Sequence, residues 1–532
     1  LMKGLVDLYA PGLHEFLPEG FIEKFNIPAL HDAVREVHFP EREKDVTILN
    51  DRGTRAQKRL IFDEFFLLEL GLATMKRGRM EGAKAEPLRG DGSLTGRFVE
   101  SLPFDLTDAQ RKVIAEISAD MEGDAPMNRL LEGDVGCGKT VVAVHAVLQA
   151  AEAGRQSALM APTEILAEQH YINVKKYLSG TGVEAALLTS SLRKKEKDAA
   201  LLAIAGGRVK LAVGTHSLIQ EGVEFARLGL AVIDEQHRFG VMQRAGLSGK
   251  GTNPHVLVMT ATPIPRTLAL TVYGDLDVST IDTLPRGRTP VMTKLFDEKN
   301  RAEAYRLVRR ELAKGMQAYV VYPLVEESER SDLKAAKEGA QRLAEVFREY
   351  RVGLLHGRMK PAEKESVMDE FRAGRVNLLV ATTVVEVGVD VPDATVMVVE
   401  HAERFGLAQL HQLRGRVGRS SHQSYCVLLA EAVTDVSRER LSAMLRSASG
   451  FDIAEEDLRL RGPGEFFGTR QSGLPEITYG SIVKDGRILT AARKEAFDII
   501  GKDPELKSPG LAALKAELMR KWEDKLRLVT IS

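Results

Sequence analysis

Cysteine and long apolar runs are what this 532-residue chain lacks most clearly. The only two cysteines, Cys137 and Cys426, lie far apart, and Cys137 falls inside a glycine-rich loop where a disulfide would obstruct binding. A secreted, disulfide-stapled fold is thereby excluded, and we expect a reducing cytosol. No apolar stretch approaches the ~20 residues that span a bilayer, and no signal peptide opens the chain, so we expect no membrane role.

A strong net charge is also absent, because the formal balance is −1 at pH 7. A nucleic-acid partner therefore cannot be read from overall charge and would have to show as local basic patches. The length exceeds what one hydrophobic core supports and predicts about three or four domains. The chain opens with Leu1 in mid-pattern, so we expect a fragment of a longer protein.

A glycine-rich loop is the feature around which the rest is organised. Residues 133–140 read GDVGCGKT and match G-x-x-x-x-G-K-[ST] without mismatch. A strand-length segment (127–131) precedes the loop and a helix-length segment (141–148) follows it, which disfavours the alternative of a glycine-rich surface turn. Lys139 would reach the β- and γ-phosphates, and the Thr140 hydroxyl would bind Mg²⁺. The glycines that let backbone N–H groups face the phosphates are Gly133, Gly136 and Gly138.

An acidic pair follows a predicted strand in the same region. Residues 96–285 alternate apolar strand-length segments with longer helical patterns, which is typical of a parallel α/β sheet. One such strand, 228–233, ends in Asp234 and Glu235. Beside a phosphate loop the pair fits two tasks: Asp234 holds Mg²⁺, and Glu235 orients and activates the attacking water. The alternative is an acidic turn without chemistry.

Two weaker signals accompany the pair. Thr260 and Thr262 follow the apolar run 256–259, where their hydroxyls could link the nucleotide site to a DNA site. Gln110 precedes the loop and could read an adenine edge with its bidentate amide. An ordinary helix-surface glutamine fits Gln110 equally well.

Residues 286–440 repeat the strand and helix alternation without a phosphate loop. Strands are predicted at 318–321, 352–355, 378–381 and 396–399. Residues 412–419 close this region with Arg414, Arg416 and Arg419, whose fixed forks of donors suit the charge of a γ-phosphate. Alone, the run could be a basic helix end. Beside the loop and the acidic pair it predicts arginines delivered from a second lobe, which closes on ATP and opens on hydrolysis.

The first 95 residues predict helices. Apolar residues recur at the spacing of a core-facing helix at Ile61, Phe62, Phe65, Phe66 and Leu68. We expect this helix to dock on the next domain. Residues 75–95, rich in Gly, Lys and Arg, favour a solvated linker over a DNA contact.

Taken in order, these segments resemble the motifs of superfamily 2 helicases. The matching segments are residues 133–140, 161–164, 213–216, 234–237, 260–262, 355–357, 381–390 and 412–419. The resemblance implies an α/β fold of two tandem RecA-like parallel-sheet domains with a helical leader and a C-terminal translocation element. Its implied divisions are residues 1–95, 96–285, 286–440 and 441–532. The implied cofactors are ATP and Mg²⁺.

The same resemblance implies roles for individual residues. Catalysis would involve Glu235, Gln412, Arg416 and Arg419. The nucleotide would be held by Gln110, Gly133, Gly136, Gly138, Lys139, Thr140, Asp234 and Asp390, with Thr140 and Asp234 as Mg²⁺ ligands. DNA would be bound at Thr163, Thr215, His216, Gly357, Thr382 and Thr383. Coupling of nucleotide to DNA would involve His237, Thr260, Thr262, Arg470 and Gln471.

A narrower resemblance covers residues 450–473, which look like the translocation motif shared by the RecG family and the transcription-repair coupling factors. The pattern predicts a helix at 453–460, stopped by Gly-Pro-Gly, and then a loop with Arg470 and Gln471. A C-terminal packing element is the alternative. Further segments are more similar to the RecG family than to the coupling factors: residues 37–40, 62–70 and 234–240.

The RecG family implies an ATP-dependent DNA helicase that remodels branched DNA by regressing stalled forks and migrating Holliday junctions. Implied partners are branched or forked DNA and single-stranded DNA-binding protein, for a monomeric, nucleoid-associated chain in the cytoplasm. The family's N-terminal wedge is not recognisable, because residues 1–95 hold no run of alternating strands sufficient for a five-stranded barrel. Three rivals stay open: a coupling-factor-like translocase acting on stalled RNA polymerase, a non-hydrolysing nucleotide switch or DNA-binding scaffold, and a small-molecule kinase.

Overall fold

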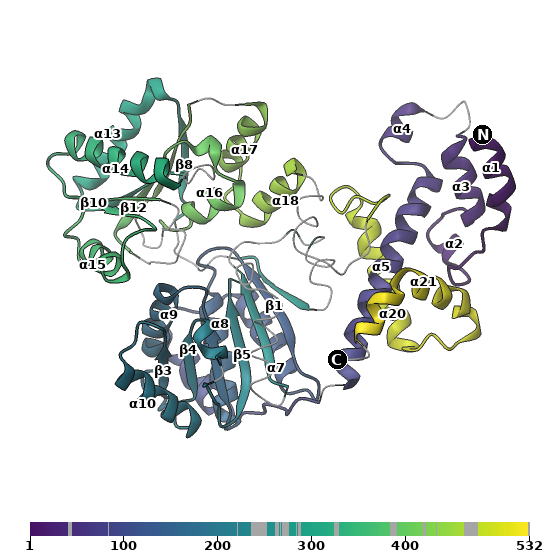
Figure 1. Cartoon of the computed structure of the whole chain (residues 1–532), viewed down its shortest axis with the longest axis horizontal. Coiled ribbons are helices and arrows are strands. Elements are labelled where there is room, and N and C mark those ends of the chain that lie inside the picture. The colour runs from purple at the N-terminus through teal and green to yellow at the C-terminus, as the bar shows by residue number, and fades with distance from the viewer. Residues whose placement is uncertain are drawn as a thin grey trace. The chain divides into compact units, whose positions relative to one another are not determined.

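The computed structural model describes residues 1–40, 45–82, 84–220, 222–235, 253–260, 265, 268, 276–283, 285, 289–323, 329–382, 391–418, 422–431, 434–461 and 477–529. The chain divides into two compact units. Leu1–Lys84, Pro265–Asp277 and Arg461–Ser532 form the helical unit, and Ala85–Ile264 and Val278–Leu460 form the two-sheet unit. Figure 1 labels the elements of both.

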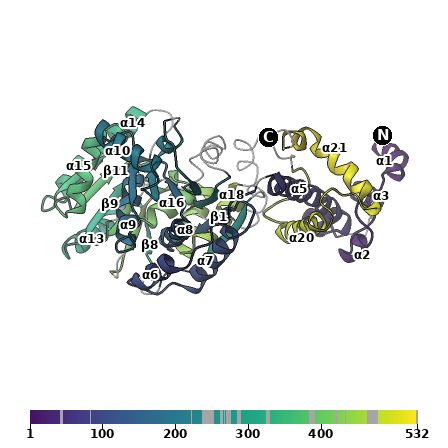
Figure 2. The same ribbon diagram turned by 90° about the horizontal axis from the view of Figure 1, so that it is seen from below.

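The helical unit is organised around one long helix, α5 (Arg55–Gly82). Its other elements are α1 (Met2–Tyr9), η1 (Ala10–Gly12), α2 (Phe21–Lys24), α3 (Leu30–His38), α4 (Val46–Asn50), α20 (Gly486–Lys502), η7 (Pro509–Leu511) and α21 (Ala512–Val529). The predicted apolar helix is confirmed, but it runs on through residues 75–82, where the sequence suggested a linker. Helices α3, α20 and α21 pack on α5, as Figure 1 and Figure 2 show, and the docking of this helix on the next domain stays a prediction.

Side chains from the C-terminal helices fix this packing. Trp522 lies against Gly71, where any side chain would collide with the indole, and its Nε1 donates to the Leu67 carbonyl at 3.2 Å. Arg493 pairs with the fully buried Glu69 at 2.7 Å. The glycine at position 71 is therefore a packing requirement: it costs α5 some helix propensity and lets the two helices approach closely.

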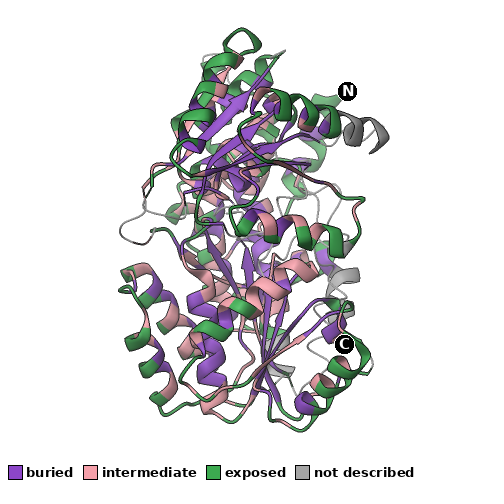
Figure 3. Ribbon diagram, turned by 90° about the vertical axis from the view of Figure 1, so that its left-hand side faces the viewer, coloured by how far each residue is buried: buried purple, intermediate pink, exposed green. Residues whose placement is uncertain are grey.

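The first lobe of the two-sheet unit is a seven-stranded sheet in the order β3-β4-β2-β5-β6-β1-β7. Its elements are α6 (Ser93–Ser101), α7 (Asp108–Met121), β1 (Asn128–Gly133), α8 (Lys139–Glu152), β2 (Gln156–Met160), α9 (Glu164–Tyr177), β3 (Ala185–Leu188), α10 (Lys194–Ala205), β4 (Leu211–Gly214), η2 (His216–Ile219), β5 (Leu228–Asp234), β6 (His255–Thr260) and β7 (Asp277–Ile281). The pairs from β3 through β1 are parallel, with Leu130 opposite Val258 in the β1–β6 pair. Strands such as β5 are buried on both faces, which is why they read as unbroken apolar runs (Figure 3). Because parallel strands end at one edge, the residues that follow β1, β2, β4, β5 and β6 lie along a single rim.

The second lobe is a six-stranded parallel sheet in the order β10-β11-β9-β12-β13-β8. Its elements are β8 (Met292–Phe296), η4 (Glu298–Asn300), α13 (Arg301–Leu312), β9 (Gln317–Val321), α14 (Glu329–Val346), β10 (Val352–Leu355), α15 (Pro361–Arg372), β11 (Leu378–Ala381), β12 (Ala394–Val399), η6 (Ala402–Arg404), α16 (Leu407–Arg414), β13 (Tyr425–Leu429), α17 (Asp435–Arg446) and α18 (Gly450–Arg461). The four predicted strands are present as β9 to β12. The predicted α/β fold with two parallel-sheet domains is confirmed, while the divisions at residues 95, 285 and 440 stay a prediction.

The structure also bears on the expectations about disulfides and membrane-spanning segments. Cys137 and Cys426 are both buried, and neither forms a disulfide. In the part of the chain that the structure describes, no helix combines the length and apolarity needed to cross a lipid bilayer.

Candidate nucleotide site

The loop that ends β1 has the backbone expected of a phosphate cradle. Gly136 and Gly138 lie in the left-handed region, with φ of 79° and 94°, which glycine adopts readily. A side chain at Gly133 would collide with the Cys137 thiol and the Ile281 carbonyl. Helix α8 begins directly after Gly138, so its first N–H groups and the positive end of its dipole face the loop.

Two side chains hold the loop in this shape. Lys139 Nζ donates to the carbonyls of Gly133 and Asp134 at 2.6 and 3.0 Å. Gln110 is buried in the first turn of α7, where its Nε2 donates to the Cys137 carbonyl at 2.8 Å and its Oε1 completes a capping box. The structure therefore gives Gln110 a supporting role, and its reading of adenine stays a prediction.

Asp234 ends β5 as an ionised carboxylate. His170 of α9 donates from Nε2 to Asp234 Oδ2 at 2.7 Å, and the Glu235 N–H donates to Oδ1 at 3.1 Å. Burial raises the pKa of Asp234, but the hydrogen bond and charge of His170 and the charge of Lys139 outweigh burial and lower that pKa. A buried, ionised carboxylate beside a phosphate loop fits Mg²⁺, which takes one or two protein carboxylates and completes its shell with phosphates and water. The described residues contain no cluster of three or more metal-ligating side chains.

Glu235 follows Asp234 in a strained backbone conformation. Its φ of 55° lies in the left-handed region, which costs a non-glycine residue about 1–2 kcal/mol. Strain of this kind collects at catalytic sites, where the surrounding structure holds a side chain at a required angle. Thr260 ends β6 on the same rim and is buried. Three other predicted residues lie outside the described residues: His237, Thr262 and Asp390.

The second lobe contributes α16 and the residues just beyond it. Gln412 is buried on this helix, Arg416 follows its C-terminal end, and Arg419 lies outside the described residues. The structure corrects the prediction that groups Arg414 with Arg416 and Arg419. The guanidinium of Arg414 is buried and caps the end of α17. The main-chain carbonyls that accept from it are those of Met444, Ser447 and Ala448.

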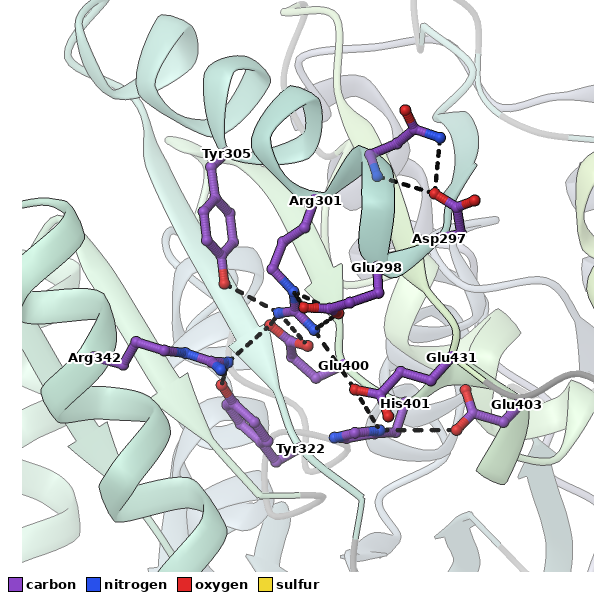
Figure 4. Close-up of polar contacts among 11 residues, drawn as sticks. Asp297, Glu298, Arg301, Tyr305, Tyr322, Arg342, Glu400, His401, Glu403 and Glu431 are labelled. Atoms are coloured by element: carbon purple, nitrogen blue, oxygen red, sulfur yellow. Dashed lines mark hydrogen bonds and ion pairs between the residues drawn. The ribbon is translucent and has the colours of Figure 1, made fainter.

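A buried ion-pair cluster fixes the turn that leads into α16. Glu400 follows β12 and is fully buried, and Arg301 donates to both of its carboxylate oxygens at 2.7 and 2.9 Å (Figure 4). Tyr305 accepts from Arg301 at 3.1 Å, and Glu298 accepts from the same guanidinium. Burial lowers the pKa of Arg301, but these partners outweigh burial and raise it above its usual value. The connection from β12 to α16 is therefore held by charge-assisted hydrogen bonds.

The two lobes meet at the phosphate loop. Asp134 Oδ1 accepts from His411 Nε2 at 2.5 Å, and Oδ2 accepts from the Gly450 N–H at 2.9 Å. Gly415 approaches Val135 so closely that a Cβ on the glycine would lie 2.7 Å from the valine Cβ. The first-lobe loop and the second-lobe segment around α16 are thus brought together, as a two-lobe nucleotide clamp requires.

The residues predicted to bind DNA follow strand ends on both lobes. Thr163 caps α9 and Thr215 caps η2, each through its hydroxyl. His216 and Gly357 are exposed, whereas Thr215 and Thr382 are each only 2% exposed, so their hydroxyls reach a phosphate only after a local rearrangement. Three further predicted residues lie outside the described residues: Thr383, Arg470 and Gln471. All these DNA and coupling roles stay predictions.

Three residues of the site escaped sequence reasoning: His170, His411 and Asp134. Two are single histidines on helices, and Asp134 fills a position that the loop template leaves variable. The one usable signal was adjacency, since His411 directly precedes Gln412 and Asp134 directly follows Gly133.

Family models match three parts of the chain. A model described as "DEAD/DEAH box helicase" matches residues 107–271, and one described as "Helicase conserved C-terminal domain" matches residues 302–421. With the two parallel sheets, these matches put the protein in the class of superfamily 2 helicases. A third model, "ATP-dependent DNA helicase RecG, domain 3, C-terminal", matches residues 447–532.

Proteins of similar sequence identify the family within this class of helicases. The chain is 45% identical over 513 residues to the ATP-dependent DNA helicase RecG of Bacillus subtilis, with 96% of this chain and 74% of that protein covered. It is 48% identical over 528 residues to RecG of Streptococcus pneumoniae, with 97% and 77% covered. The chain belongs to the RecG family. It spans 60% of the length of the RecG of Synechocystis sp., to which it is 50% identical over 512 residues, or 96% of this chain.

A solved structure described as "Structure of RecG bound to three-way DNA junction" is 43% identical to the chain. The TM-score is 0.69, with 92% of this chain and 64% of that chain covered. A DNA-bound structure of the helicase MrfA, 16% identical with a TM-score of 0.51 over 78% of this chain and 58% of that chain, shares the fold alone.

Proposed function

We propose that this protein is an ATP-driven helicase and duplex translocase that remodels branched DNA, acting in fork regression, Holliday-junction branch migration and hence recombination and repair. One observation carries the proposal. The phosphate loop and α16 meet through Asp134 and His411 in a chain 43% identical to a RecG solved on a three-way DNA junction. A nucleotide held where the lobes meet would draw them together and release them on hydrolysis.

Nucleotide binding falls to the first lobe. Lys139 turns from the carbonyls of Gly133 and Asp134 to the β- and γ-phosphates, which its flexible stem allows. Thr140 and Asp234 are the proposed ligands of Mg²⁺, which when bound neutralises charge on the phosphate oxygens.

Hydrolysis requires residues from both lobes. Glu235 orients and activates the attacking water, and Arg416 and Arg419 stabilise the charge that develops on the transferring phosphoryl group. Preorganised donors of this kind act most strongly where water is excluded, as between closed lobes. The remaining proposed nucleotide contacts are Gln110, Gln412 and Asp390.

DNA is held mainly through its phosphates. Hydroxyls and backbone N–H groups position a duplex without reading its bases, so affinity should be largely independent of sequence. The proposed contacts are Thr163, Thr215, His216, Gly357, Thr382 and Thr383. The proposed coupling residues are His237, Thr260, Thr262, Arg470 and Gln471.

Cellular context is proposed on family grounds. We place the protein in the cytoplasm with the nucleoid, as a monomer, with single-stranded DNA-binding protein as a second partner. Sedimentation at working concentration and a pull-down with that protein test these points. The coupling-factor alternative is not favoured, because the C-terminal model and the relatives described above are RecG proteins.

The test is ATP hydrolysis and strand separation on a synthetic three-way fork, with a linear duplex of equal length as control. We expect the fork to stimulate hydrolysis more than the duplex, and unwinding to require ATP. Fork affinity should fall by about tenfold or more from low to moderate salt, since phosphate contacts release counterions. Equal stimulation by both DNAs would contradict the branched-DNA proposal, and a fork affinity insensitive to salt would contradict the phosphate contacts.

A further inference from the structure

The carboxylate of Asp134 joins three segments of the chain. Besides His411 Nε2 and the Gly450 N–H, its Oδ1 accepts from the N–H of Val135 at 2.6 Å. Burial raises the pKa of Asp134, but the hydrogen bond from His411 and the two backbone N–H donors outweigh burial and lower that pKa. Asp134 is therefore ionised, and each contact is a charge-assisted hydrogen bond.

The main chain of Asp134 is tied to the nucleotide end of the loop. Its carbonyl accepts from Lys139 Nζ at 3.0 Å. When Lys139 turns to phosphates it releases this carbonyl, so the residue that grips the second lobe through its side chain loses a restraint on its backbone. Asp134 thus contacts the nucleotide-binding lysine through its main chain and the second lobe through its side chain.

The second-lobe side of the contact is rigid. Arg414 Nη2 lies 2.8 Å from His411 Nδ1, and an arginine can only donate, so Nδ1 is the acceptor and the His411 proton sits on Nε2, facing Asp134. The same guanidinium holds carbonyls at the end of α17. Gly450 is the first residue of α18, and Ser449 caps that helix through its hydroxyl. A displacement of Asp134 therefore reaches α16 and α18 together.

We propose that Asp134 is a positioning residue that transmits nucleotide-dependent movement of the phosphate loop to α16 through His411 and to α18 through Gly450. The link to DNA movement rests on the function proposed above, whereas the link between nucleotide and α18 does not. A contact that only packs the two lobes together would leave α18 unaffected by nucleotide. A contact that transmits movement makes the hydrogen exchange of α18 change when nucleotide binds.

One substitution removes the hydrogen bond to α18 without changing a residue of the loop. Gly450→Pro deletes the donor N–H at the first position of a helix, where proline is well tolerated, and the capping conformation expected of Ser449 is compatible with a following proline. Gly450→Ala is the matched control, because it adds a side chain and keeps the N–H. Asp134→Asn weakens the same contact from the first lobe. The NH₂ group of the asparagine would face the N–H donor of either Gly450 or His411, so one of these two hydrogen bonds is lost. Thermal unfolding verifies that each variant is folded.

The measurement is hydrogen exchange of the 532-residue chain with and without Mg²⁺ and AMP-PNP. In the parent and in Gly450→Ala, nucleotide should change protection in both residues 133–152 and residues 444–461. In Gly450→Pro the change at 444–461 should fall by about fivefold or more, while that at 133–152 persists. Asp134→Asn should lose part of the α18 response, because one amide oxygen replaces the two carboxylate oxygens that accept from His411 and Gly450.

Unwinding supplies a second readout. Base pairs separated per ATP should fall by about fivefold to tenfold in Gly450→Pro relative to Gly450→Ala. An α18 response in Gly450→Pro equal to that in Gly450→Ala overturns the proposal, and so does an α18 of the parent chain that ignores nucleotide. If the parent chain shows the α18 response yet never unwinds a fork, the proposed function fails and the coupling stands.

Discussion

His170 Nε2 lies 2.7 Å from Asp234 Oδ2, so a histidine on α9 holds the carboxylate that ends β5. The contact follows from sheet order: β2, which leads into α9, pairs in parallel with β5, and both strands end at the same rim. A carboxylate that accepts a hydrogen bond from such a donor is held in one orientation even without a bound metal ion. His170 would therefore support the proposed Mg²⁺ site without being a ligand.

We expect His170→Ala to raise the Mg²⁺ concentration for half-maximal ATP hydrolysis by about tenfold, the usual effect of losing a partner behind a metal ligand. The measurement is a Mg²⁺ titration of hydrolysis at saturating ATP. His170→Gln keeps a side-chain N–H donor and should recover part of the loss. An unchanged Mg²⁺ requirement in His170→Ala would remove this role.

Glu235→Gln should keep ATP affinity within about threefold and lose hydrolysis by about 10²-fold or more, because an amide cannot accept a proton from water. Steady-state hydrolysis and binding of a fluorescent ATP analogue separate the two effects. Glu235→Gly should be equally inactive yet more stable by about 1 kcal/mol, since glycine relieves the strain of a φ of 55°. Near-normal turnover in Glu235→Gln would assign the water to another residue.

His255 should make the first lobe acid-sensitive. The Met127 N–H donates to its Nδ1 at 3.1 Å and its Nε2 lies 3.3 Å from the Glu86 carbonyl, so the buried ring is neutral, and burial lowers its pKa from 6.5 to about 4. The unfolded chain binds the extra proton first, so this stability is complete above pH 6.5 and is lost as pH falls toward about 4.

The loss amounts to about 2 kcal/mol at about pH 5. Urea unfolding at about pH 7.5 and about pH 5 measures it, with His255→Asn as the control that keeps an acceptor and cannot titrate. An equal pH dependence in both proteins would contradict the assignment.

Gly71→Ala should loosen the helical unit by about 1–3 kcal/mol, because its methyl group would overlap the Trp522 indole. Trp522 is the single tryptophan of the chain and is buried, so its emission reports directly on this packing and should shift to longer wavelength. Gly501→Ala is the matched control, since the added methyl group meets nothing within 4 Å. Identical emission and stability in the two variants would contradict the described contact.

What the sequence could predict was local. Strands such as β5 could be predicted because both of their faces are buried, which gives an unbroken apolar run. The loop at 133–140 could be predicted because its backbone requires glycine at fixed positions. Side-chain partners brought together by the fold left no periodic signal, so the burial of α5 under α20 and α21 and the contact of His170 with Asp234 were missed. Arg414 shows the same limit: as a residue type it matched Arg416, and only its carbonyl partners separate the two.

The proposed mechanism requires one nucleotide to be bound by the phosphate loop of the first lobe and by arginine from the second. The most direct measurement is ATP hydrolysis by Arg416→Ala on forked DNA, beside Arg438→Ala, which changes an exposed arginine of α17 that pairs with Asp435. We expect Arg416→Ala to bind an ATP analogue nearly normally and to lose turnover by about 10³-fold or more, while Arg438→Ala matches the parent chain. Turnover in Arg416→Ala equal to that of Arg438→Ala would contradict it.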